Sequence, residues 1–196
     1  LSHAAGYQAS ARTDLVACSD LRTAVMEQFR RRYGIPKERQ YTDYKEMIAR
    51  EDLDIVSVAS YSPVHAEHAI ACAQAGAKAI YCEKPAAQTV PDAEQMLAVC
   101  AEAGALLVFN HQRRFTSCIR RLRDHIKDNG LGELTSVNAQ WPAGRLGNVG
   151  SHVFDTICMV TRRRIEAVSA TLDLAGKPDC RGSQFADPGG WGTIRL

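Results

Sequence analysis

Residues 14–109 repeat one pattern, in which a short apolar run is followed by a segment with helical periodicity. The clearest apolar run covers residues 54–60, and the helical segment after it starts at Pro63, a residue suited to a first helical turn. Strands this apolar, each followed by a helix, are typical of a parallel sheet covered on both faces. The pattern predicts strands at 14–19, 41–42, 54–60, 78–82 and 106–109, and helices at 21–33, 44–50, 63–75 and 91–103.

The pattern changes after Asn110, where a helix no longer separates every pair of predicted strands. Helices are predicted at 116–127 and 148–160, and strands of alternating polarity at 133–140 and 165–174. This order is typical of an α+β domain. We therefore predict two domains, an α/β domain over residues 1–110 and an α+β domain over residues 111–196.

The tripeptide Glu83-Lys84-Pro85 stands where the predicted strand at 78–82 ends. In open α/β sheets the carboxyl ends of the strands are where ligands bind. A lysine held there is a candidate proton-transfer group, because partial desolvation lowers an amine's pKa toward neutrality. The alternative interpretation is a surface salt bridge followed by a proline that opens the next helix.

Composition argues against several classes of protein. A net charge of +2 is too small for a dedicated nucleic-acid binder, and the arginines at 30–32 are expected on a solvated helix end. No apolar run approaches the roughly 20 residues of a membrane span. The first residues show neither the basic start nor the apolar core of a signal peptide. We expect no nucleic-acid or membrane partner.

The seven cysteines form no Cys-x-x-Cys pair, which argues against a zinc knuckle or a thioredoxin-type site. Most of them stand inside apolar segments, as buried free thiols do. Free thiols are typical of a reducing compartment, so we predict a cytoplasmic protein.

Five landmarks follow one another along the chain: Asp20 at a strand end, Ser60-Tyr61-Ser62-Pro63-x-His65, Glu83-Lys84-Pro85, Asn110-His111-Gln112-Arg113-Arg114-Phe115 and Gly150-Ser151-His152-x-x-Asp155. In this order and spacing the chain resembles the Gfo/Idh/MocA family, NAD(P)-dependent oxidoreductases that act on sugars, inositols and related molecules. The resemblance implies a Rossmann-like parallel sheet followed by part of an α+β substrate domain. It implies too that the first strand, with its glycine-rich phosphate-binding turn, and the C-terminal part of the substrate domain are missing here.

The resemblance also implies a nicotinamide cofactor. Asp20 matches the acidic residue that accepts hydrogen bonds from the adenosine ribose, which favours NAD, although an aspartate here can also cap the following helix. Arg22 would accommodate the 2′-phosphate of NADP, so NADP stays possible. The further cofactor contacts that the resemblance implies are Ser60, Tyr61, His65, Glu83, Lys84 and Arg113.

His65 and His68 stand three residues apart and raise the alternative of a metal pair. Two histidines without a third ligand are more typical of a helix surface than of a zinc site. We predict no metal site.

In relatives, a lysine at the position of Lys84 lies between the cofactor and the substrate hydroxyl, and the proline after it is often cis. The family usually places an aspartate four residues before the catalytic histidine. Here the histidine is His152 and the earlier residue is Asn148, which can orient a hydroxyl but cannot accept its proton. The resemblance therefore implies catalytic roles for Lys84, His152 and Asn148, while Asp155 is expected to support the structure. The alternative for His152 is a locally bonded residue at a helix N-terminus.

The residues of the second domain that stand near these landmarks are candidate substrate contacts. They are His111, Trp141, Arg145, Asn148 and His152. The resemblance does not choose among them.

The leading hypothesis is an enzyme that transfers a hydride between a nicotinamide cofactor and a sugar, inositol or related polyol. The alternative is a non-catalytic member that senses a dinucleotide or a sugar, which the asparagine at 148 would favour. A zinc hydrolase built on His65 and His68 is the third and weakest hypothesis. For the full-length protein the resemblance implies a homo-oligomer.

Overall fold

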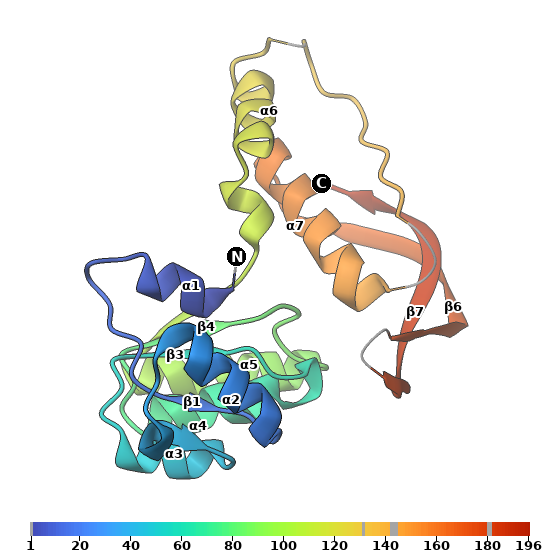
Figure 1. The fold of residues 1–196 in the computed structure, drawn as a ribbon. Coiled ribbons are helices and arrows are strands. Elements are labelled where there is room, and N and C mark those ends of the chain that lie inside the picture. Colours follow the sequence, from blue (N-terminus) through green and yellow to red (C-terminus); the bar gives the residue numbers. More distant parts are fainter. Residues whose placement is uncertain (1, 131, 142–144, 180–181) are drawn as a thin grey trace. The chain divides into compact units, whose positions relative to one another are not determined.

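The computed structural model describes residues 2–130, 132–141, 145–179 and 182–196, with side chains outside 174–186. The chain divides into two compact units, Leu1–Phe109 and Asn110–Leu196 (Figure 1). The first unit ends one residue before the boundary predicted from the sequence.

The strands of the first unit all pair in parallel, as the alternating pattern predicts. They are β1 (Cys18–Ser19), β2 (Gln40–Tyr41), β3 (Ile55–Val58), β4 (Ala79–Cys82) and β5 (Leu106–Phe109). The last three form one sheet in the order β3-β4-β5, and the first two form a separate pair. β1 covers only two residues and is much shorter than the strand predicted at 14–19.

Helices precede and connect these strands. They are α1 (His3–Gln8), α2 (Thr23–Tyr33), α3 (Tyr44–Arg50), α4 (His65–Gln74) and α5 (Val90–Glu102), with short 3₁₀ turns η1 (Lys37–Arg39) and η2 (Ser62–Val64). The predicted helix at 63–75 begins as η2 and continues as α4. The fold class is confirmed: the unit is an α/β arrangement around a parallel sheet.

Side-chain and backbone caps set several helix ends. The Asp43 carboxylate accepts a hydrogen bond from the Lys45 amide at the start of α3, and Thr89 accepts one from the Asp92 amide at the start of α5. Gly34 ends α2 with a φ of 74°, a left-handed conformation that favours glycine. The basic last turn of α2 was predicted as a solvated helix end, and Arg30 and Arg31 there both pair with Glu27.

The core lies between one face of the β3-β4-β5 sheet and the helices α4 and α5. Val56, Val58, Ile80 and Cys82 point to this face, where Ile80 and Cys82 are fully buried. The core is completed by side chains of α4, α5 and their flanking turns: Ala69, Cys72, Ala73, Ala77, Met96, Cys100 and Ala105. Because strand side chains alternate, Ser57 and Tyr81 point to the opposite face.

The second unit combines helices with one antiparallel hairpin. It contains η3 (Gln112–Phe115), α6 (Ser117–Lys127), a π-helical turn η4 (Leu146–Gly150), α7 (Ser151–Thr161), β6 (Ala167–Asp179) and β7 (Gly182–Arg195). β6 pairs with β7, with Val168 opposite Ile194 and Thr171 opposite Trp191. The predicted strand at 165–174 is confirmed in position and extends further.

The strand predicted at 133–140 is wrong. These residues form no helix or strand, and all their side chains are exposed. Alternating polarity stabilises a strand only when one face is buried and a neighbouring strand takes its hydrogen bonds. Neither condition is met here.

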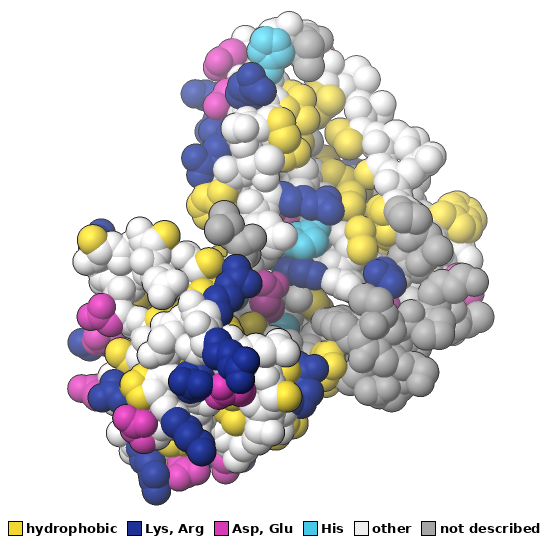
Figure 2. Space-filling model, viewed as in Figure 1, with side chains coloured by type: hydrophobic (Ala, Val, Ile, Leu, Met, Phe, Trp, Pro, Cys, Tyr) yellow, Lys and Arg dark blue, Asp and Glu magenta, His cyan; other side chains and the backbone are white. Residues whose placement is uncertain are grey.

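None of the described helices is long and apolar enough to cross a membrane. On the face shown in Figure 2, basic and acidic side chains are interspersed over the first unit. Among the described residues, no group of three or more His, Cys, Asp or Glu side chains could hold a metal ion.

We predict that Cys118, which is exposed on α6, reacts with a thiol reagent in the native protein, while the buried Cys72, Cys82 and Cys100 react only on unfolding. Burial raises the pKa of Cys72 to about 11 and that of Cys82 to about 12, and it also raises the pKa of Cys100. The reactive thiolate is therefore scarce at pH 8. Peptide mass spectrometry after alkylation, with Cys118→Ser as the control, tests this. Rapid native labelling of Cys82 would contradict it.

Candidate functional site

The turn that follows β4 carries Glu83, Lys84 and Pro85. The Glu83 amide donates a 2.8 Å hydrogen bond to the Val58 carbonyl, which continues the β3–β4 pairing by one bond. The Lys84 amide donates to Oε2 of Glu83 at 3.2 Å. The peptide bond between Lys84 and Pro85 is cis, as expected. The turn therefore starts from the carboxyl edge of the sheet, where the sequence places it.

His65 holds this turn against the end of β3. Its ring Nδ1 lies 2.8 Å from the Pro85 carbonyl oxygen, and its Nε2 lies 3.0 Å from the Ser60 carbonyl oxygen. Carbonyl oxygens only accept, and a neutral imidazole carries a single N–H, so such a ring donates to one of the two oxygens at a time. Only 1% of the residue is exposed. Both ring nitrogens thus face backbone carbonyl oxygens, and the residue positions the two turns, while its contact with a cofactor stays a prediction.

The residues around Ser60 form a second small network. His68 Nδ1 lies 3.0 Å from the Ser60 hydroxyl, and its ring packs on Tyr44 with 4.1 Å between centroids. Burial lowers the pKa of His68. The His65 and His68 rings thus contact different atoms of Ser60, its carbonyl oxygen and its hydroxyl.

Asp20 follows β1 at the carboxyl edge of the two-stranded sheet. Its Oδ1 accepts hydrogen bonds from the backbone amide of Arg22 at 2.8 Å and from the Arg22 Nε at 3.2 Å. The hydrogen bond to Asp20 raises the pKa of the Arg22 guanidinium. Arg22 is the N-cap residue of α2, which has no side-chain cap, so the Asp20 carboxylate binds the residue before the helix rather than the first helical turn.

Sequence reasoning missed three residues on the opposite face of the sheet. His3 of α1 lies with Nδ1 3.1 Å from the Ser57 hydroxyl and with Nε2 3.1 Å from Oε1 of Glu83. Tyr7, one turn later, places its hydroxyl 2.7 Å from the Ser57 hydroxyl. The available signal was the alternation along β3, which turns Ser57 away from the core.

In the second unit, Asp155 of α7 binds the guanidinium of Arg114, with Nη2 2.6 Å from Oδ1. The His111 Nδ1 lies 3.7 Å from the other carboxylate oxygen. His111 also meets His152 edge to face, with 6.0 Å between ring centroids, and His152 is 8% exposed. Two of the candidate substrate contacts are therefore neighbours, and Asp155 links α7 to η3.

The remaining candidates of this unit lie before α7. Asn148 was predicted in a regular helix but lies in the π-helical turn, where the amides of Gly147 and Asn148 donate to the Asp187 carboxylate at 2.8 Å each. Trp141 packs edge to face on Phe154 of α7. Arg145 precedes the turn with a left-handed φ of 64°. Arg113 is part of η3.

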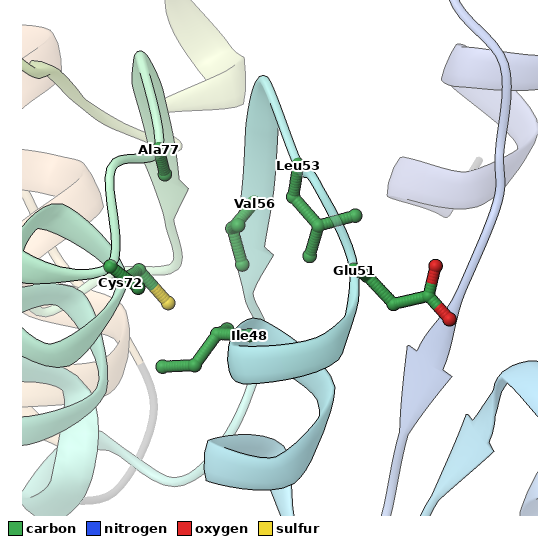
Figure 3. A pocket seen from close by; sticks show the side chains of 7 residues that line it. Ile48, Glu51, Leu53, Val56, Cys72 and Ala77 are labelled. Atoms are coloured by element: carbon green, nitrogen blue, oxygen red, sulfur yellow. The ribbon is translucent and has the colours of Figure 1, made fainter.

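One small hollow of the first unit lies at the other end of the strands. It is lined by Ile48, Glu51, Leu53, Val56, Cys72, Ala75 and Ala77, at the amino ends of β3 and β4 (Figure 3). Its volume of about 10 Å³ holds about one water molecule. Figure 3 shows the Glu51 carboxylate pointing away from the apolar side chains, and it accepts a hydrogen bond from the Tyr41 hydroxyl. This hollow is too small to be a cofactor site.

Residues 2–111 match a family model described as an oxidoreductase family with an NAD-binding Rossmann fold, Gfo/Idh/MocA. Myo-inositol 2-dehydrogenase of Thermotoga maritima is 30% identical over 119 residues, which cover 61% of this chain and 35% of the relative. D-glucoside 3-dehydrogenase of Escherichia coli is 29% identical over 172 residues, or 88% of this chain and 46% of the relative. The chain thus spans less than half the length of these two relatives.

Solved structures agree with this match. A putative myo-inositol dehydrogenase of Sinorhizobium meliloti is 26% identical with a TM-score of 0.73, covering 88% of this chain and 55% of that one. The WlbA dehydrogenase of Bordetella pertussis, solved with NADH and UDP-GlcNAcA, is 22% identical with a TM-score of 0.81, covering 98% and 59%. At that identity the WlbA likeness shows the fold alone.

We predict that His65→Leu lowers the free energy of unfolding by about 2–3 kcal/mol, because it leaves the carbonyl oxygen of Ser60 or Pro85 without its donor. The matched control is His68→Leu, which removes a half-buried ring bonded to one hydroxyl and should cost about 1 kcal/mol. Urea unfolding followed by circular dichroism measures both. Equal losses in the two variants would contradict the role of His65.

Proposed function

Because the chain belongs to the Gfo/Idh/MocA family of NAD-binding oxidoreductases, we propose that the protein containing it oxidises or reduces a sugar, inositol or related polyol. The observation that carries the proposal is the Glu83-Lys84-Pro85 turn, held by His65 at the carboxyl edge of a parallel sheet. This edge is where open α/β sheets bind their ligands. A carboxylate and an amine are presented there together.

The residues of the first unit fit a nicotinamide dinucleotide. Asp20 and Glu83 follow two of the parallel strands at their carboxyl ends, and their side chains are 32% and 28% exposed. Carboxylates at this edge accept hydrogen bonds from ribose hydroxyls. We assign Asp20 to the adenosine ribose and Glu83 to a cofactor ribose, with Ser60 and Tyr61 of the β3 turn and Arg113 as further contacts.

The pairing of Asp20 with Arg22 supports NAD as the preferred cofactor. The arginine that could bind a 2′-phosphate is bonded through its Nε to the Asp20 carboxylate. The carboxylate itself repels a phosphate dianion at the same place. NADP would have to bind with Arg22 turned away from Asp20.

When bound, the cofactor supplies hydride transfer at the nicotinamide C4. Oxidation of a secondary alcohol then leaves one proton from the hydroxyl to be taken up. We assign that proton to the Lys84 amine and the His152 imidazole, which return it in the reverse reaction. Asn148 is assigned to orient the substrate hydroxyl, and His111, Trp141 and Arg145 are assigned to substrate contacts.

The proposal also covers the cellular compartment and the oligomeric state. We propose a cytoplasmic homo-oligomer whose partner is a small polyol or sugar. The described cysteines are all free, with three of them buried in the first unit, which supports a reducing compartment.

We predict that Lys84→Ala in the full-length protein lowers kcat at least a hundredfold, because it removes the proton-transfer group, while NAD still binds. Turnover is measured with NAD and a panel of inositols and sugars, and binding by calorimetry. Lys78→Ala is the matched control, since this lysine pairs with Asp54 at the opposite end of the strands. Equal activity of Lys84→Ala and wild type would remove Lys84 from the mechanism, and NAD binding without turnover of any substrate would favour a sensor.

We predict that Asp20→Ala weakens NAD binding and strengthens NADP binding, because a ribose acceptor and a phosphate-repelling charge are lost together. The ratio of the two dissociation constants should shift at least tenfold toward NADP. Glu27→Ala, the loss of an equal charge on α2, should leave the ratio unchanged. An unchanged ratio in Asp20→Ala would refute the assignment of this residue.

A further inference from the structure

His3, Ser57, Tyr7 and Glu83 form a chain of hydrogen bonds on the face of the sheet opposite the core. The chain joins residues 80 positions apart in sequence, since it runs from α1 through β3 to the turn after β4. Glu83 is the one member with a place in the proposed function. The proposed function gives no role to His3, Ser57 or Tyr7.

The direction of the bonds follows from the chemistry of the groups. A carboxylate only accepts, so His3 Nε2 carries the hydrogen and donates it to Oε1 of Glu83. In the neutral imidazole, Nδ1 then accepts from the Ser57 hydroxyl. The Ser57 oxygen in turn accepts from the Tyr7 hydroxyl. Every donor in the chain thus points toward the Glu83 carboxylate.

The His3 ring is held in one orientation. It stacks on Tyr81 of β4, with 4.4 Å between centroids and 29° between planes, and its side chain is 16% exposed. The neighbouring Ala4 is buried and anchors α1 to the unit. The Tyr7 carbonyl accepts a 2.7 Å bond from the Thr13 hydroxyl, which ties the end of α1 to the next segment. The ring itself is held by the stacking on Tyr81 and by its hydrogen bonds with Ser57 and Glu83.

The order Ser57, His3, Glu83 is that of a hydrolase triad, but the surroundings differ. The nucleophilic serine of such enzymes is exposed on a sharp turn, whereas Ser57 lies inside β3. Its hydroxyl is also bonded to Tyr7 at 2.7 Å. The chain of bonds serves the carboxylate rather than the serine.

We propose that His3 is a positioning residue that holds the Glu83 carboxylate ready to bind a ribose hydroxyl of the cofactor. The proposal rests on the proposed function, because it takes from there the role of Glu83. His3 occupies one site on Oε1, and the Lys84 amide occupies one on Oε2.

Burial and the Glu83 charge raise the pKa of Tyr81. The phenol stacked on His3 therefore stays neutral at physiological pH. Tyr81 therefore places no second negative charge beside the His3 imidazole.

Two amide substitutions separate the bonds of His3. His3→Gln places an amide nitrogen near the position of Nε2 and can still donate to Glu83. His3→Asn reaches only as far as Nδ1 and keeps the Ser57 contact alone. In the full-length protein, calorimetry with NAD should show a dissociation constant within about threefold of wild type for Gln, and raised about tenfold for Asn and for His3→Ala. The kcat at saturating NAD should change less than threefold in all three, because Lys84 is intact.

A double-mutant cycle tests whether His3 acts through Glu83. In a Glu83→Ala background the further change His3→Asn should weaken NAD binding by less than twofold, since the carboxylate that His3 binds is already absent. An additional tenfold loss would overturn the proposal, as would equal NAD affinity in the wild type, Asn and Ala forms or equal weakening in Gln and Asn. Failure of the wild type itself to bind NAD would instead refute the proposed function.

Thermal unfolding of each variant identifies a merely structural effect. If His3→Asn does not fold, Ser57→Ala and Tyr7→Phe replace it, because they release the ring from its other side and leave the imidazole in place. These two should raise the NAD dissociation constant about two- to fivefold at unchanged thermal stability. Unchanged affinity in both would overturn the proposal.

Discussion

The parallel pairing of β3 with β4 is the constraint on which the candidate site depends. Val58 lies opposite Cys82, so the two strands end at the same edge, and one more backbone bond joins Glu83 to Val58. The segments that follow β3 and β4 therefore begin next to each other. The pairing is stabilised by the burial of Ile80 and Cys82 against α4 and α5, a gain of about 1.5–3 kcal/mol for a large side chain such as Ile80. The polar turn is thus positioned by apolar packing on the other side of the strands.

Periodicity was sufficient to predict this part of the fold. In α5, predicted at 91–103, Met96 and Cys100 stand one turn apart and are both buried, because helical spacing places them on the face that covers the sheet. Leu97, the next residue after Met96, is 53% exposed, since it stands at the edge of that face. At 133–140 the alternation was present without a partner strand, and a local pattern does not reveal whether a partner exists.

The contacts of the candidate site were harder to predict, because they join distant parts of the sequence. Glu83 and Lys84 were identified from their place after a strand, but the bond from His3 to Glu83 has no local signature. His65 was predicted as a cofactor contact from its motif, whereas its contacts with the carbonyl oxygens of Ser60 and Pro85 were visible only in the tertiary structure. The residue types were enough to predict the chemistry of the candidate site. The direction in which each side chain points could be known only from the tertiary structure.

The clamp formed by His65 restricts how the connection between β3 and α4 can vary. One imidazole reaches the carbonyl at position 60 and the carbonyl at position 85, and His65 is itself the first residue of α4. Adding or deleting a single amino acid between Ser60 and His65 would rotate the ring by about 100° around the helix axis, away from both oxygens. This surface connection should therefore tolerate exchanges of side chain far better than changes of length, which is the reverse of the usual behaviour of exposed loops.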